Sequence, residues 1–189
     1  MTAAGTFDNT GNTGAQICVY CHTPHNANLN IDGPLWNRNV AVGTYTMYNG
    51  GAPSGSIKGT FDASPNPETL ICLGCHDGVS AVDSIVNLPG RDPDVTWATG
   101  GQSLSDIASY AVLGSDLSDD HPVSITFEPT LNAGLAAMGV PEAAGLKFFG
   151  PGANKVECAT CHNVHGTGHA QLLRVSSDGS LICLTCHLM

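Results

Sequence analysis

Apolar residues occur along this chain in short runs that polar residues and turn formers interrupt. The longest of these runs predict short helices at residues 105–112, 131–138 and 141–146. Residues 123–127 (VSITF) alternate between apolar and polar side chains, which is typical of a short strand. Residues 49–66 and 88–104 have the composition of loops. The predicted fold class is therefore mostly irregular and loop-rich, with short α-helices and little β-structure.

The composition supplies few aromatic side chains to fill a core. Aromatic residues make up only 6% of the 189 residues, and there are 23 glycines and 11 prolines. A single domain of this length normally buries about 70% of the surface that its unfolded chain exposes. We therefore expect something other than side chains to supply part of the apolar interior.

The charge balance narrows the choice of partners. The formal net charge is −10, with only six Lys and Arg residues, which disfavours tight binding to nucleic acid or to anionic lipid. A basic protein or another subunit is a more suitable partner. No run approaches the roughly 18 apolar residues of a transmembrane helix.

The eight cysteines form four Cys-x-x-Cys pairs, and each pair is followed directly by a histidine. We call these the first to fourth motifs: Cys18, Cys21 and His22; Cys72, Cys75 and His76; Cys158, Cys161 and His162; Cys183, Cys186 and His187. The first and third lie in similar segments (ICVYCHTPHN at 17–26, ECATCHNVHG at 157–166), as do the second and fourth (LICLGCH at 70–76, LICLTCH at 181–187). The repeat predicts a duplicated two-motif unit within one domain of residues 1–189, at about 14–90 and 150–189, with a connecting region at about 91–149.

The spacing within each motif suits covalent attachment of a c-type haem. In a helical turn, thiols at i and i+3 lie on one face, where they reach the two vinyl groups at one edge of the porphyrin. The histidine that follows then ligates the iron from the proximal side. Zinc sites, redox-active pairs and disulfides do not require a histidine after every pair. We therefore predict four haem c groups, bound through all eight cysteines.

Four further histidines equal in number the distal ligands that four haems need: His25, His121, His165 and His169. Methionine is the usual other sixth ligand, and Met47, Met138 and Met189 are available, but the matching numbers favour two histidines on every iron. Six-coordinate iron has no open position for a substrate. We therefore predict an electron-transfer protein and not an enzyme.

The short spacing between His22 and His25 limits which haem His25 serves. Three residues span at most about 10 Å, so His25 stays on the side of the haem that His22 occupies and must ligate a different one. His165 repeats this arrangement after the third motif. We expect a row of closely spaced haems. By analogy between the repeats, we expect His165 to serve the second haem; if His25 serves the fourth, His121 and His169 are left for the first and third.

The segments CxxCHTPHN, DHPVS, CxxCHNVHG with the later LLR, and LICLTCH resemble the doubled-CxxCH multihaem cytochromes. Within that group they are most similar to the OmcE-type tetrahaem cytochromes of metal-reducing bacteria, which polymerise outside the cell into filaments with a continuous haem chain. The resemblance implies that His25, at the position of a bridging histidine, ligates the haem at His187 of a neighbouring molecule. A heterologous bond of that kind does not close and extends into a filament.

The motifs and the resemblance together favour an extracellular conduit for long-range electron transfer. Its partners are copies of itself, redox proteins or extracellular acceptors such as metal oxides. Two alternatives stay open: a soluble monomeric periplasmic shuttle, and a multihaem reductase, which needs one iron without a distal histidine. Residues 1–4 lack the features of a signal peptide. Because haem is attached outside the cytoplasm, we expect an exported protein from which a signal peptide has been removed.

Overall fold

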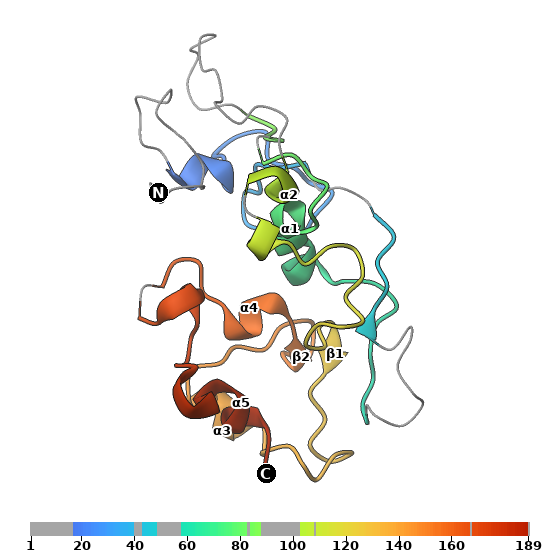
Figure 1. Cartoon of the computed structure of the whole chain (residues 1–189), viewed down its shortest axis with the longest axis vertical. Helices are drawn as coiled ribbons and strands as arrows, with labels where there is room; N and C mark the ends of the chain where they lie inside the picture. Colours follow the sequence, from blue (N-terminus) through green and yellow to red (C-terminus); the bar gives the residue numbers. More distant parts are fainter. Residues whose placement is uncertain are drawn as a thin grey trace. The chain divides into compact units, whose positions relative to one another are not determined.

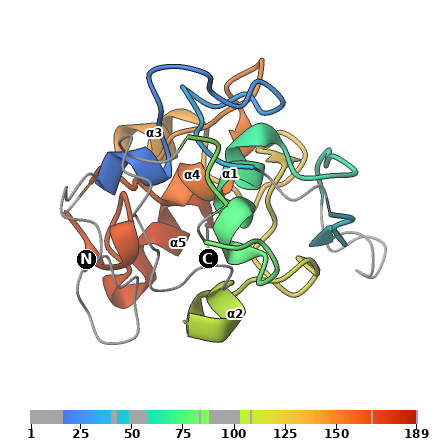
Figure 2. The same ribbon diagram turned by 90° about the horizontal axis from the view of Figure 1, so that it is seen from above.

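The computed structural model describes residues 17–39, 43–48, 58–82, 84–87, 103–107, 109–166 and 168–188. Most of this chain is loop, and its helices are short (Figures 1 and 2). The loop-rich fold class is therefore confirmed. No helix in the described ranges is long and apolar enough to cross a membrane. The chain divides into two compact units, Met1–Thr44 with Leu70–Asp116 (unit 1) and Tyr45–Thr69 with Leu117–Met189 (unit 2).

Unit 1 contains η1 (Ile17–Tyr20), most of α1 (Pro67–His76), α2 (Leu104–Ile107) and η3 (Ser109–Ala111), where η denotes a 3-10 helix. α1 begins at a proline, which suits the first helical position because its missing N–H has no partner there. The small core of this unit forms around Val82 and Leu104, against which Cys75 and Val112 pack. The second motif therefore lies on the core of unit 1.

Unit 2 contains seven short elements: β1 (Ile125–Thr126), α3 (Gly139–Ala143), β2 (Lys155–Val156), α4 (Cys158–Cys161), η4 (Ala170–Leu172), η5 (Asp178–Ser180) and α5 (Leu181–Cys186). β1 and β2 form an antiparallel pair with Ile125 opposite Val156 (Figure 1). Phe127 and Phe148 pack in the core with ring centroids 5.0 Å apart. The strand pair joins the segment that follows His121 to the segment that leads into the third motif.

Some of the elements predicted from the sequence are confirmed and others are not. The strand within 123–127 is confirmed as β1, residues 105–112 form two separate turns, α2 and η3, and α3 covers only the start of 141–146. The helix predicted at 131–138 is wrong. There Ala136 donates its N–H to the carbonyl of Cys186 (2.9 Å), and Gly134 accepts from the N–H of Leu188 (2.8 Å). These long-range bonds satisfy groups that a helix would pair internally. Of the predicted loops, residues 49–57 and 88–102 lie outside the described residues.

Candidate haem-binding site

Each cysteine pair lies in, or directly after, a short helical turn. η1 and α4 hold the first and third motifs, and the C-terminal ends of α1 and α5 hold the second and fourth. The i, i+3 spacing therefore puts both sulfur atoms of a pair on one face, as the sequence predicts. All eight cysteines are free thiols, so disulfide bonds do not use them.

The first and third motifs are followed by loops that return to the motif in the same way. A single antiparallel bridge pairs His22 with Trp36 in one loop and His162 with Leu173 in the other. In both loops the residue after the bridge donates its backbone N–H to the carbonyl of the second cysteine, over 2.9 Å in the first motif and 2.8 Å in the third. The repeat in the sequence is therefore also a repeat of local structure.

Three proximal histidines share a hydrogen bond that fixes their tautomer. Nδ1 lies 2.7 Å from the carbonyl oxygen of Pro34 in His22, and 2.7 Å from that of Ala111 in His76. In His162, Nδ1 lies 2.9 Å from the carbonyl oxygen of residue 171. A carbonyl oxygen only accepts, so Nδ1 carries the proton and Nε2 keeps its lone pair. Metal-bound histidines usually donate their other N–H in this way, so these imidazoles are in the form that binds iron.

Two buried side chains, which the motif analysis missed, tie the first two motifs to one segment. Asn37 donates from Nδ2 to the carbonyl of Val19, inside the first motif, over 2.6 Å. Arg38 donates from Nη2 to the carbonyl of Gly74, inside the second motif, over 3.1 Å, and from Nη1 to that of Val82 over 2.7 Å. The scarcity of basic residues marks Arg38 as unusual in the sequence, whereas nothing marks Asn37.

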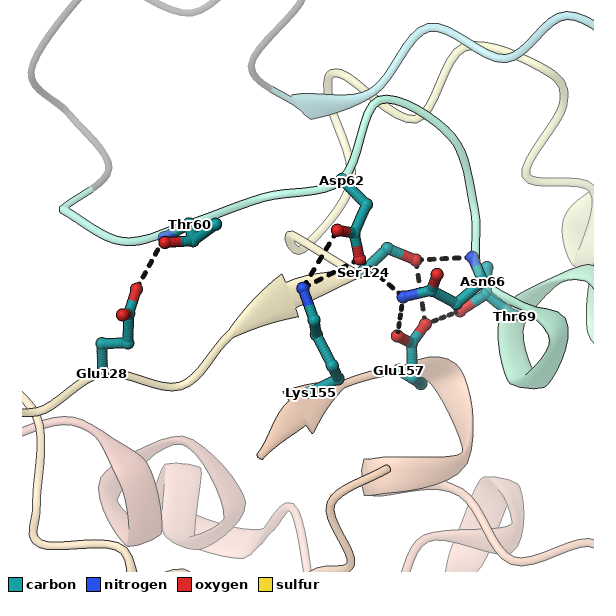
Figure 3. Close-up of polar contacts among 8 residues, drawn as sticks. All are labelled: Thr60, Asp62, Asn66, Thr69, Ser124, Glu128, Lys155 and Glu157. Carbon is teal, nitrogen blue, oxygen red and sulfur yellow. Dashed lines mark hydrogen bonds and ion pairs between the residues drawn. The ribbon is translucent and has the colours of Figure 1, made fainter. Parts of the chain in front are cut away.

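Glu157, directly before the third motif, is a buried carboxylate that the motif analysis also missed. It is 1% exposed and accepts hydrogen bonds from Thr69 Oγ1 (2.6 Å), Asn66 Nδ2 (2.9 Å) and Ser124 Oγ (3.0 Å), as Figure 3 shows. Satisfying a buried carboxylate with several donors offsets much of its desolvation cost. Since Ser124 lies three residues after His121, the network anchors the His121 segment to the third motif.

The surroundings of the cysteines favour uncharged sulfur. Burial raises the pKa of Cys21, Cys75 and Cys161, and it raises the pKa of Cys186 to about 11. After burial, the next cause is a cysteine of another motif: Cys75 raises the pKa of Cys21, and Cys161 that of Cys186. In each unit the second cysteines of its two motifs therefore lie close enough to interact.

Large apolar side chains are exposed beside every motif. Leu35 is 56% exposed, Val79 78%, Val164 68% and Leu188 59%. These exposed side chains could contact the faces of a porphyrin, which are apolar. The described ranges include all eight cysteines and all eight histidines, and no three His, Cys, Asp or Glu side chains within them form a metal-binding group. The residues of each motif fit haem, because two thiols and the imidazole that follows them are the groups that a c-type haem takes from a protein.

Of the four predicted distal histidines, His121 lies beside a proximal one. The ring centroids of His121 and His187 are 6.4 Å apart, and the ring planes are inclined by 71°. His121 is exposed as a residue, but partial enclosure of its ring, with a contribution from His187, lowers its pKa. The imidazole is therefore neutral near pH 7. His25, His165 and His169 are exposed, and the haem that each serves stays a prediction.

A comparison with known families agrees with this chemistry. The family described as "Doubled CXXCH motif" matches residues 150–188, which hold the third and fourth motifs. No curated protein matches the chain. The motifs and the family match indicate binding of haem of the c type, whose chemistry fits an electron carrier better than an enzyme.

Proposed function

We propose that the chain carries four haem c groups and transfers electrons along them, with two histidines on each iron. The observation that supports this most strongly is the tautomer of His22, His76 and His162, whose Nδ1 atoms donate to backbone carbonyls, so that the lone pair lies on Nε2. When bound, a c-type haem supplies an iron that accepts and releases one electron. The cysteines attach it, and the carbonyls hold the imidazoles in the orientation that binds it.

The arrangement of the attachment sites within each unit supports electron transfer between haems. In each unit the second cysteine of one motif raises the pKa of the second cysteine of the other, Cys75 that of Cys21 and Cys161 that of Cys186, so haems attached there would lie near each other. Asn37 and Arg38 hold the first two motifs to one backbone segment. Electrons then pass over short distances without a mobile carrier. With two histidines on every iron, no position remains for a substrate, which disfavours the reductase alternative.

We further propose that copies of the chain join head to tail into an extracellular filament, as the resemblance to OmcE-type cytochromes implies. His25 is exposed, and its ring makes no hydrogen bond within the described part of the chain, so it is available to a neighbouring molecule. Redox proteins and extracellular acceptors such as metal oxides are the expected partners. A monomeric periplasmic shuttle is the second candidate, since it has the same haem chemistry without the bond between molecules.

The number of haems is tested by the intact mass of the denatured, fully matured protein. Noncovalent haem is lost on denaturation, so the mass should exceed that of the 19.4 kDa chain by four haems. The double variant Cys183→Ser/Cys186→Ser should lose one haem and keep three. A wild-type mass with three haems or fewer would reject the proposal.

The absence of an open iron position is tested with carbon monoxide. The reduced protein should bind little of it near neutral pH, because both axial positions of each iron hold imidazole. Rapid binding at one haem per chain would favour the reductase alternative. Negative-stain electron microscopy of the same sample distinguishes the filament from the monomeric shuttle.

A further inference from the structure

His121 and His187 come from distant parts of the sequence and lie together in unit 2. Their ring centroids are 6.4 Å apart and their planes are inclined by 71°. No hydrogen bond joins the two rings, although both residues belong to the described part of the chain. The two imidazoles therefore lie close together without bonding each other.

The separation matches the space that one iron atom requires. A histidine nitrogen lies about 2.0 Å from a bound metal ion and the ring centre lies about 1.2 Å beyond it, so two imidazoles on opposite faces of one iron have centroids about 6.3 Å apart. Rings in direct edge contact also span about 4.5–7 Å. The distance alone therefore does not distinguish ligation from direct contact. His187 favours ligation, because the Cys-x-x-Cys-His motif already assigns its ring to an iron.

The tautomer of His121 suits ligation. Its Nδ1 lies 3.1 Å from the carbonyl oxygen of Pro122. Because that oxygen only accepts, Nδ1 carries the proton and Nε2 keeps the lone pair that binds iron. Three of the proximal histidines show the same arrangement, which is the usual one for metal-bound histidine.

Hydrogen bonds on both sides of the pair fix its separation. Ser124, three residues after His121, donates its hydroxyl to the Glu157 carboxylate over 3.0 Å. On the other side, Leu188 donates its N–H to the carbonyl of Gly134 over 2.8 Å. All of these residues belong to unit 2. The fold of this one unit therefore sets the distance between the two imidazoles.

We propose that His121 is the distal ligand of the haem attached at the fourth motif, opposite His187 of the same chain. This assignment rests on the proposed function, since it presupposes covalent haem at that motif. It replaces the bond from a neighbour's His25 that the resemblance implies for this haem, and it also replaces the expectation that His121 serves the first or third haem. The fourth haem is then six-coordinate in a single molecule, and a bridging His25 serves a different haem.

The test compares His121→Ala with His25→Ala in the full-length, fully matured protein. The six basic residues, at positions 38, 58, 91, 147, 155 and 174, are the trypsin sites, and they put each motif on its own peptide. The fourth motif falls on residues 175–189 and the third on 156–174. Brief treatment with hydrogen peroxide destroys a haem with an open iron position before it destroys six-coordinate haems. Peptide mass spectrometry then identifies the opened haem.

We expect His121→Ala to gain one haem per chain that binds carbon monoxide, with peroxide damage on peptide 175–189. Free imidazole should restore its low-spin spectrum, and His25→Ala should leave this peptide intact. Damage on another peptide in His121→Ala, damage on 175–189 in His25→Ala, or four low-spin haems in His121→Ala would each overturn the inference. Failure of the proposed function is seen separately, as a wild-type mass with fewer than four haems.

His121→Met tests the same assignment if the alanine variant does not mature. Methionine keeps a sixth ligand, and His/Met ligation raises the reduction potential above that of a bis-histidine haem. One of the four haems should therefore titrate at a higher potential than any haem of the wild type. Unchanged potentials at all four would overturn the inference.

Discussion

At the scale of single residues, two buried charges of opposite sign lie beside the haem-attachment motifs. Arg38 is 1% exposed and donates to backbone carbonyls, and no carboxylate of the described residues pairs with it. Burial raises the pKa of Cys21 and Cys75, and the charge of Arg38 has the smaller, opposite effect of lowering it. Arg38 therefore lies near both attachment sites. Glu157 is the buried anion directly before the third motif. Water and salt screen such charges little, so each acts on the haem nearest to it.

The two charges should shift reduction potentials in opposite directions. Glu157→Gln should raise the potential of the haem at the third motif, because a negative charge opposes the addition of an electron. Arg38→Gln should lower the potentials of the haems at the first and second motifs, because it removes a positive charge. We expect shifts on the order of tens of millivolts. Potentiometric titration of the haem absorbance measures them.

Two control variants separate charge from packing. Arg38→Lys keeps the charge and loses the forked geometry, so it should leave the potentials near those of the wild type. Glu128→Gln removes a carboxylate that, among the described residues, accepts from the N–H of Thr60 over 2.7 Å, and it should also have little effect. Potentials that fall as far in Arg38→Lys as in Arg38→Gln would show that packing, and not charge, is the cause.

At the scale of elements, the sequence predicts well what depends on local spacing. Cys-x-x-Cys-His predicts a helical turn because its chemistry needs two sulfurs on one face, and all four turns are present. The alanine-rich segment 131–138 misleads, since its backbone bonds to the fourth motif and the residue after it, 50 or more residues later. The sequence does not predict the role of Ser124, for a different reason. Its left-handed φ of 56° is rare for serine. Distant segments support it, since the hydroxyl bonds Glu157 and the backbone bonds Val156 and Asp62.

The ion pair between Asp62 and Lys155 flanks this network (Figure 3) and gives a pH-dependent prediction. Nζ lies 2.9 Å from the carboxylate, whose side chain is 35% exposed. Although burial acts to raise the pKa of Asp62, hydrogen bonds from Lys155 and Asn66 outweigh it and lower this pKa. The pair therefore stabilises the fold above the unfolded-state pKa of about 3.9, and this contribution is lost as the pH falls through the folded-state pKa.

Asp62→Asn should lower the free energy of unfolding at pH 7 by about 0.5 kcal/mol, a value kept small because solvent screens the pair. The difference from wild type should shrink as the pH falls below about 3.9 and vanish once the pH is below the lowered pKa of folded Asp62. Urea unfolding of the haem-loaded protein at pH 7 and through this acid range measures it. Asp178→Asn, at an exposed site without an ion pair among the described residues, is the control. A difference that persists at low pH would contradict the electrostatic explanation.

At the scale of the whole molecule, each unit carries two motifs, yet the division does not follow the sequence. Residues 45–69 lie between the first two motifs in the chain, but they belong to the unit that carries the last two. Asn66 and Thr69 explain this, because both donate to Glu157 of that unit. The repeat of motifs does not predict this division into units, since the hydrogen-bond partners are some 90 residues apart. The cysteines and proximal histidines can be identified from the sequence. The haem that each distal histidine serves cannot, because it depends on contacts between distant segments.

His25 and His121 then have different consequences for assembly. If His121 completes the fourth haem within its own chain, His121→Ala opens that haem but leaves the contact between molecules in place, so filaments of normal length should persist. His25→Ala removes a ligand that reaches a neighbouring molecule, so filaments should shorten or vanish while one haem, on a peptide other than 175–189, opens. Electron microscopy and the peroxide peptide map, applied to both variants and to wild type, measure the two effects together.

Normal filaments in His25→Ala with all four haems low-spin would exclude His25 as a ligand between molecules. A wild-type protein that stays monomeric at high concentration would instead favour the periplasmic shuttle, in which His25 must find its iron within its own chain.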